Sequence, residues 1–189
     1  MPESHHTAII VGAGAAGCLC AIELKRRMPP AEITILEAGR HPLAKVALTG
    51  GGRCNLTNSF SGVSDLKTVY PRGARLMKRA LRAFGPEDTM RWFESEGVRF
   101  KEEEGGRIFP ASGDAMQIVR TLQRGMEHEG VRVLCNSRVV SVARQDGDAY
   151  KLQLEEGRLM GADTVIVTTG GSPKRSGLAF LGPLGLEIV

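Results

Sequence analysis

Short apolar runs along the chain predict buried strands, each ending at a turn rich in glycine or acidic residues. Residues 7–11, 33–36 and 165–167 consist mainly of isoleucine, valine and leucine. Continuous apolar runs of this length are typical of strands buried on both faces of a parallel sheet. Between the first two runs, residues 15–28 repeat apolar side chains at helical spacing until two prolines end the pattern. The start of the chain therefore predicts a strand–helix–strand unit.

The centre of the chain predicts three further helices. Residues 74–84 place apolar side chains on one face, and residues 115–128 repeat this spacing. Between them, Pro86 lies in the first turn of another helix, which Gly97 ends. Residues 101–106 are polar and acidic, so we expect a loop or hairpin there.

The later part of the chain predicts shorter strands. Residues 131–134 form one strand, and residues 138–142, 150–154 and the segment from Leu159 follow one another with turns between them. The last three segments are typical of an antiparallel meander.

Composition places the chain among ordinary globular proteins. Its 189 residues carry 25 Lys+Arg and 21 Asp+Glu, a net charge of +4 that tolerates anionic partners without requiring nucleic acid. The four cysteines lack a C-x-x-C pair, which indicates free thiols in a reducing compartment rather than disulfides or a metal site. No apolar run reaches the length of a bilayer, and the polar start does not resemble a signal peptide. We therefore expect a cytoplasmic protein without a membrane partner.

The 24 glycines are about twice the usual share, and the first cluster of them has a specific use. Gly12, Gly14 and Gly17 form a G-x-G-x-x-G turn between a predicted strand and helix. Such glycines permit a tight turn, the approach of a diphosphate and close packing of the helix. The helix N-terminus then offers free N–H groups to the phosphates. Glu37 follows the second strand, where a carboxylate accepts hydrogen bonds from a ribose and disfavours a 2′-phosphate. The pattern predicts FAD or NAD; the alternative is a glycine-rich turn without a ligand.

Two features favour FAD over NAD. A glycine-rich loop at residues 49–58 follows directly after the acid, and a β-meander precedes the T-T-G-G turn at residues 168–171. Both resemble the FAD domains of the glutathione-reductase type, in which a meander replaces a crossover helix. We expect an α/β fold, a Rossmann-like FAD-binding domain of parallel sheet, helices and antiparallel meander.

Two motifs resemble a particular family. Residues 45–58, K-V-A-L-T-G-G-G-R-C-N-L-T-N, are similar to a signature of bacterial NAD(P)/FAD-dependent oxidoreductases, the YhiN/BaiN-like flavoproteins that include gut bile-acid reductases. Residues 106–110, G-R-I-F-P, with Ser112 and Ala115 after them, are similar to a second motif of that family. The resemblance covers nearly the whole chain, although Thr168 stands where the family more often has alanine.

Members of this family are longer, and a β-rich domain, a helical insertion and a return strand normally follow. We therefore expect residues 1–171 to be an FAD-binding domain without its return segment. Residues 172–189 would then lead toward a further domain, and the chain alone would bind FAD weakly or not at all.

The resemblance also implies a set of cofactor residues. The first glycine turn would hold the diphosphate and Glu37 the ribose, the backbone of Val139 would pair with adenine, and the second loop would follow the ribityl chain and flavin. The T-T-G-G turn would close over the cofactor. The expected cofactor-binding residues are Gly12, Ala13, Gly14, Ala15, Ala16, Gly17, Glu37, Ala38, Lys45, Gly50, Gly51, Gly52, Arg53, Cys54, Asn55, Val139, Thr168, Thr169, Gly170 and Gly171.

Some residues allow two interpretations. Arg53 either faces an anion or the flavin, or ties its loop to neighbouring groups. Cys54 is more typical of a packed thiol than of a redox centre, because no second cysteine lies at redox spacing. A basic helical stripe could contact RNA phosphates or be a solvated surface; it consists of Arg72, Arg75, Lys78, Arg79 and Arg82.

The sequence thus predicts a flavin-dependent oxidoreductase that transfers hydride from NAD(P)H through FAD to an unsaturated substrate. Within that class, the family resemblance implies two alternative substrates, a small enone-type compound and an RNA uracil in ribosomal RNA. A non-catalytic dinucleotide-binding regulatory module is the alternative of a different class. No catalytic acid can be named, and the oligomeric state is not predicted.

Overall fold

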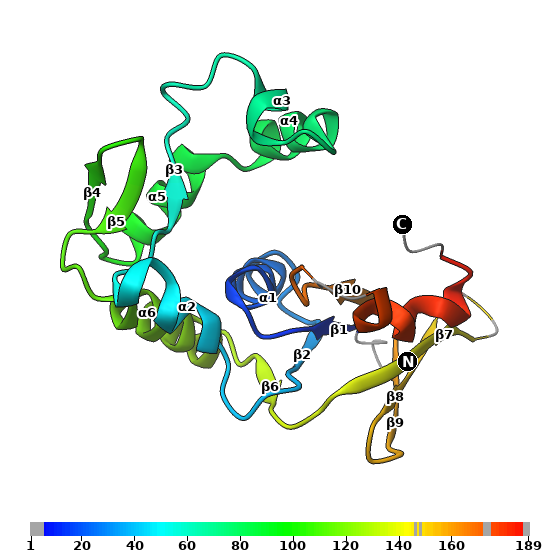
Figure 1. Ribbon diagram of the computed structural model, residues 1–189. Helices are drawn as coiled ribbons and strands as arrows, with labels where there is room; N and C mark the ends of the chain where they lie inside the picture. The colour runs from blue at the N-terminus through cyan, green and yellow to red at the C-terminus, as the bar shows by residue number, and fades with distance from the viewer. Residues whose placement is uncertain (1–5, 146, 148, 172–174, 187–189) are drawn as a thin grey trace. The chain divides into compact units, whose positions relative to one another are not determined.

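The computed structural model describes residues 6–145, 147, 149–171 and 175–186, which fall into two compact units. One unit combines residues 1–44 with residues 122–189, and the other comprises residues 45–121 (Figure 1).

The first unit is built on a parallel sheet of order β10–β1–β2–β6 (Figure 1). Its strands are β1 (Thr7–Val11), β2 (Glu32–Leu36), β6 (Arg132–Leu134) and β10 (Thr164–Val167). After β1 the chain extends the sheet on one side, and it returns with β10 on the other side. This makes β1 a topological switch point, where open α/β sheets bind their ligands.

Helix α1 (Ala15–Arg27) connects β1 to β2, as the apolar spacing predicts. Its buried face consists of Gly17, Cys18, Ala21 and Ile22, small or branched residues that allow close packing on the sheet. The register of the sheet aligns Val11 with both Leu36 and Val167. The residues that follow β1, β2 and β10 therefore meet at one edge.

The predicted meander is present. Strands β7 (Val139–Arg144), β8 (Tyr150–Leu154) and β9 (Leu159–Ala162) form an antiparallel sheet of that order. Its buried side chains share a core with β1 and β2. The 3₁₀ segment η2 (Arg175–Leu184) adds Phe180 and Leu181 to this core.

The segment after β10 is thus packed on its own unit where it is described. No regular spacing of apolar residues in this segment predicts that it packs there. Residues 172–174 and 187–189, which belong to the predicted exit segment, lie outside the described residues. The role of this segment as a connection to a further domain stays a prediction.

The second unit has a small antiparallel sheet, of order β3–β5–β4, and short helices. The acidic segment predicted as a loop or hairpin is a hairpin. The elements are α2 (Ala44–Leu48), η1 (Thr49–Gly52), β3 (Thr57–Asn58), α3 (Leu66–Val69), α4 (Ala74–Ala83), α5 (Pro86–Ser95), β4 (Phe100–Glu103) and β5 (Arg107–Pro110); α6 (Ala115–His128) follows them and continues into the first unit.

Local sequence explains where helix α5 begins and how it packs. Pro86 occupies the first position of α5, and the backbone N–H of Gly85 donates to the Asp88 carboxylate at 2.8 Å. The rings of Trp92 and Phe93 pack edge to face, with centroids 4.8 Å apart. These contacts anchor α5 in the core of the unit.

Helix α4 matches its predicted range to within one residue, but its apolar side is less covered than expected. Ala74, Met77 and Leu81 are half-buried, and Phe84 remains 43% exposed. Across the described residues, none of the helices combines the length and hydropathy that crossing a bilayer requires.

Candidate functional site

The glycine turn after β1 is closed by contacts that exclude side chains at two positions. Gly12 has φ +107°, and a Cβ there would lie 2.8 Å from the carbonyl oxygen of Thr168. A Cβ on Gly17 would lie 2.0 Å from the carbonyl oxygen of Gly12. The hydroxyl of Thr168 donates to the Gly12 carbonyl at 2.8 Å. The ends of β1 and β10 and the start of α1 are therefore in direct contact.

Gly14 differs from the other two glycines of the motif. It has an ordinary extended conformation, with φ −80°, and no atom lies within 4 Å of the position that a Cβ would take. Its lack of a side chain is not needed for packing. The space beside it is open, and the motif predicts a diphosphate there.

The N-terminus of α1 begins at this open space. No side chain caps the helix, its first turn contains no acidic residue, and Ala15 and Ala16 are exposed. The first N–H groups of a helix lack intrahelical acceptors and lie at the positive end of the dipole. With Gly14 beside them, they form a surface suited to a phosphate or another anion.

Glu37 closes β2 next to this turn, and its carboxylate is held by two backbone groups. One oxygen accepts from the N–H of Ala13 at 2.8 Å, and the other accepts from the N–H of Gly39 at 2.7 Å. The sequence did not predict the first bond. A carboxylate has about four lone-pair sites, so two remain for other donors such as ribose hydroxyls.

The electrostatic effect of Glu37 reaches two thiols nearby. Burial, and then the negative charge of Glu37, raise the pKa of Cys18 to about 12. The same two causes raise the pKa of Cys135. Both thiols are therefore neutral near pH 7, and Glu37 supplies the negative charge beside the turn.

The remaining predicted residues of this unit lie at the ends of two strands. Thr168 leads into Thr169, Gly170 and Gly171, and Gly170 has φ +75°. The backbone N–H of Thr168 donates to the carbonyl of Val11 at 2.8 Å, which fixes the start of the T-T-G-G turn. Val139 begins β7, an edge strand of the meander whose register shifts beyond this residue.

The second predicted loop belongs to the other unit and is a tight, left-handed turn. Gly50, Gly51 and Gly52 all have positive φ, and a Cβ on Gly50 would lie 2.8 Å from the backbone nitrogen of Asn55. Cys54 is buried, and burial raises its pKa, although a hydrogen bond with Thr49 opposes this effect. The interpretation of Cys54 as a packed thiol agrees with these contacts.

Arg53 has partners within its own unit. Its Nη1 donates to both oxygens of Glu103 at 3.0 Å, and its guanidinium lies 4.3 Å from the centroid of the Phe109 ring. Hydrogen bonds from Lys101 and then Arg53 hold the pKa of Glu103 below its ordinary value. These contacts tie the glycine loop to the β4–β5 hairpin. Glu103 lies in the acidic segment and Phe109 in the G-R-I-F-P motif, both noted in the sequence. Nothing in the sequence indicated that either residue contacts Arg53.

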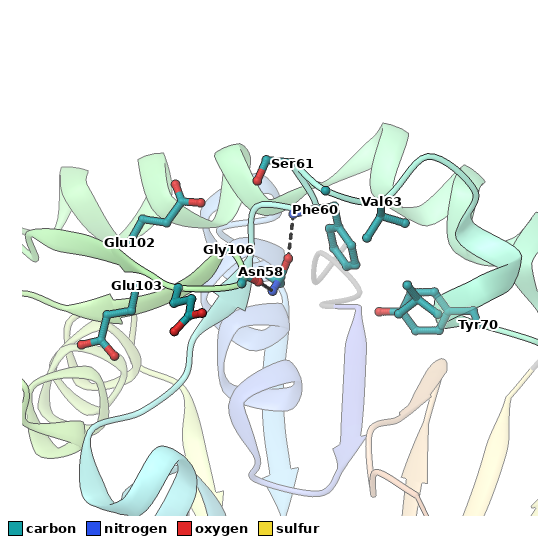
Figure 2. A pocket seen from close by; sticks show the side chains of 12 residues that line it. Asn58, Phe60, Ser61, Val63, Tyr70, Glu102, Glu103 and Gly106 are labelled. Carbon is teal, nitrogen blue, oxygen red and sulfur yellow. Dashed lines mark hydrogen bonds between the residues drawn. The ribbon is translucent and has the colours of Figure 1, made fainter.

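An open hollow in the second unit has a different character. It has a volume of about 710 Å³, and Figure 2 shows Phe60 and Tyr70 on one side and Glu102 and Glu103 on the other. With Glu104, three carboxylates line it; Glu103 is paired with Arg53 and Lys101, whereas Glu102 and Glu104 have no ion-pair partner among the described residues. An acidic hollow disfavours phosphates. It also contains none of the predicted cofactor residues.

The predicted site residues that follow β1, β2 and β10 therefore lie together at one edge of the first unit. The predicted residues of the glycine loop belong to the second unit. Lys45 is exposed on α2, and Ala38 and Asn55 are exposed in loops. The Nε of Arg107 donates to the carbonyl of Glu104 at 2.9 Å, which supports a structural role for that arginine.

Comparison with known proteins identifies relatives of this chain. The family description "HI0933-like protein Rossmann domain" matches residues 6–177. The 3-dehydro-bile acid delta(4,6)-reductase of Clostridium scindens is 31% identical over 167 residues, covering 88% of this chain and 39% of that protein. The ribosomal RNA dihydrouridine synthase of Escherichia coli is 32% identical, covering 87% and 39%. The chain thus spans about two fifths of the length of these curated relatives.

Solved structures share the fold at low identity. A flavocytochrome c3 fumarate reductase in an open conformation aligns with a TM-score of 0.59 and 20% identity, covering 97% of this chain and 37% of that one. THI4 of Thermovibrio ammonificans aligns with a TM-score of 0.57 and 12% identity, covering 97% and 64%. These matches concern the fold, and the predicted Rossmann-like α/β fold of FAD-binding proteins is confirmed. Because the family description covers nearly all of the sequence, the chain belongs to the HI0933-like family, as its two motifs predict.

Proposed function

We propose that this chain is the FAD-binding part of a flavin-dependent reductase that uses NAD(P)H to reduce an unsaturated substrate. The observation that carries the proposal is the open surface beside Gly14, where the uncapped N-terminus of α1 lies at the switch point of the sheet. Membership of the HI0933-like family supports the same cofactor class.

Each predicted residue of the first unit has a role consistent with its geometry. The N–H groups at the start of α1 bind the diphosphate, with Gly14 providing the approach. Glu37 accepts from the ribose with the lone pairs that Ala13 and Gly39 leave free. The backbone of Val139 pairs with adenine. The remaining residues assigned to this unit's site are Gly12, Ala13, Ala15, Ala16, Gly17, Ala38, Thr168, Thr169, Gly170 and Gly171.

The glycine loop of the second unit is assigned to the flavin end of the cofactor. The positive φ angles of Gly50 to Gly52 give it a narrow backbone without side chains. Arg53 holds this loop through Glu103 and Phe109, so we assign it a positioning role. Lys45, Cys54 and Asn55 complete the assigned set. When bound, the flavin would supply the redox chemistry: it would accept hydride from reduced nicotinamide and pass it to one carbon of a double bond, whose other carbon would take a proton from solvent or an acidic group.

The substrate class has two alternatives, and the relatives represent both. One relative carries the name of a bile-acid reductase and the other that of a ribosomal RNA dihydrouridine synthase. By analogy, this chain would serve the reduction of a small enone-type compound or of an RNA uracil. Both reactions require the same cofactor and donor, so the cofactor can be tested first.

The test is a titration of the chain with FAD and with ADP, followed by flavin fluorescence and calorimetry. We expect ADP and FAD to compete for one site, with weak affinity for FAD if further chain completes that site. Anaerobic addition of NADH or NADPH to the complete gene product should then bleach the flavin absorbance. Absence of both ADP and FAD binding would contradict the proposal, and binding without reduction would favour the regulatory module.

A further inference from the structure

Helix α4 carries a dense strip of positive charge. The basic face consists of four exposed side chains of the helix and one in the turn just before it; these are Arg75, Lys78, Arg79 and Arg82, with Arg72 before them. None of the five has an ion-pair partner among the residues that the structure describes. The charge of this face is therefore available to a partner outside the protein.

The spacing of these residues puts them on one side of the helix. Arg75, Arg79 and Arg82 are separated by four and three residues, and Lys78 lies between them. At 1.5 Å per residue, the face extends about 10 Å from Arg75 to Arg82. Such a row can contact successive phosphates of one nucleic acid strand.

The charge is concentrated in this segment. Residues 66–86 contain 6 of the 25 lysines and arginines and none of the 21 acidic residues. The other 168 residues therefore carry 19 basic and 21 acidic side chains, a net charge of −2. The positive net charge of the whole chain thus comes from one short segment. The rest of the chain is slightly acidic, so the surface as a whole is not basic.

The opposite side of α4 is partly covered by the protein. Ala74, Met77 and Leu81 are half-buried and α4 contacts α3, whereas Leu76 is 69% exposed and Phe84, just after the helix, is 43% exposed. A helix that binds a membrane surface needs its apolar side free to enter the lipid. Here that side is partly covered, while the cations are exposed. This arrangement favours a polyanion over a membrane.

We propose that the basic face of α4 binds the sugar–phosphate backbone of RNA. The guanidinium fork suits phosphate oxygens, and four of the five cations are arginines. RNA binding by this face requires neither flavin nor nicotinamide, so it can fail or succeed independently of the proposed function.

The experiment measures fluorescence anisotropy of a labelled, short, single-stranded RNA with the 189-residue chain over a range of salt concentrations. The test variant combines R75Q, R79Q and R82Q. The matched control combines R132Q, K151Q and R158Q, which removes the same charge at exposed positions of the other unit. A third variant, R75K/R79K/R82K, keeps the charge. Circular dichroism and urea unfolding establish that all four proteins are folded.

We expect the test variant to bind RNA about 100-fold more weakly at about 0.1 M salt, because each lost contact on a single strand costs about fivefold. Its slope of log affinity against log salt should be shallower by about 2. The control and the lysine variant should retain most of the affinity. Equal losses in test and control, RNA binding that is absent in the unaltered chain, or binding of anionic vesicles in preference to RNA would each overturn the proposal. ADP or FAD binding that survives in the test variant would show that the cofactor site is separate and intact.

Discussion

The carboxylate of Glu37 accepts a hydrogen bond from the backbone N–H of Ala13 at 2.8 Å, which fastens the end of β2 to the glycine turn after β1. The other oxygen of Glu37 binds the N–H of Gly39. The residue assigned to the ribose therefore also holds the conformation of the turn assigned to the diphosphate. A substitution of Glu37 should affect stability and nucleotide binding together.

Glu37→Gln tests this double role. A glutamine keeps the shape but offers an NH₂ group to one of the two N–H donors, which leaves a donor without an acceptor. Because the Gly39 bond is exposed and the Ala13 bond is part-buried, we expect the free energy of unfolding to fall by about 0.5–1.5 kcal/mol, the usual net contribution of a hydrogen bond. Urea unfolding measures this change, and Glu32→Gln is the matched control because Glu32 is exposed on the same strand. Equal stability of the two variants would contradict the role of Glu37 in holding the turn.

Gly14 and Gly17 should respond differently to alanine. A Cβ at residue 17 would lie 2.0 Å from the Gly12 carbonyl oxygen, so G17A should lower the free energy of unfolding by about 1–3 kcal/mol or more. A Cβ at residue 14 meets nothing within 4 Å, so G14A should cost less than about 1 kcal/mol.

G14A, the less destabilising variant, should nevertheless impair nucleotide binding. In G14A the new methyl group occupies the open space, and ADP affinity should fall by tenfold or more while the fold is retained. Calorimetry with ADP, alongside urea unfolding, separates the two effects. Unchanged ADP affinity in a folded G14A variant would argue against this surface as the diphosphate site.

The parts that the sequence predicted well are those with a local signal. The strand–turn–helix around Gly12 to Gly17 follows from apolar spacing and the glycine motif, and α5 follows from Pro86. The unpredicted contacts are long-range. The Ala13–Glu37 bond depends on the register of β1 with β2, and Arg53 finds Glu103 fifty positions later in the chain. Phe180 belongs to a segment without a regular period, so only tertiary packing reveals its burial.

Arg53 and Glu103 predict a pH dependence. Because partners lower the pKa of Glu103 in the folded state, its stabilising contribution is present at neutral pH and is lost as pH falls through that lowered pKa. In Arg53→Gln the pKa of Glu103 should rise but stay below its ordinary value, because Lys101 remains as the larger cause.

The measurement is the urea midpoint of R53Q and of the unaltered chain as a function of pH, with NMR titration of the glutamates. The two midpoints should differ at neutral pH and approach each other in acid. Arg99→Gln is the control, because Arg99 is exposed and its side chain makes no hydrogen bond or ion pair among the residues that the structure describes. A difference between R53Q and the unaltered chain that is the same at every pH would show that the Phe109 contact, rather than the ion pair, dominates.

Cys18 should be the least reactive of the thiols near the glycine turn. Its pKa of about 12 leaves roughly one thiolate in ten thousand at pH 8, and only the thiolate reacts with iodoacetamide. Cys135 is half-buried and should be alkylated earlier, as measured by peptide mass spectrometry over time.

Removing the charge in Glu37→Gln should lower the pKa of both thiols and accelerate labelling of Cys135, whereas Glu32→Gln should not. Burial should still keep Cys18 slow in the folded variant, because desolvation is the larger cause of its raised pKa. Labelling of Cys18 in the native chain at the rate seen in urea would show that the start of α1 opens readily, and a rigid anion-binding surface there would then be untenable.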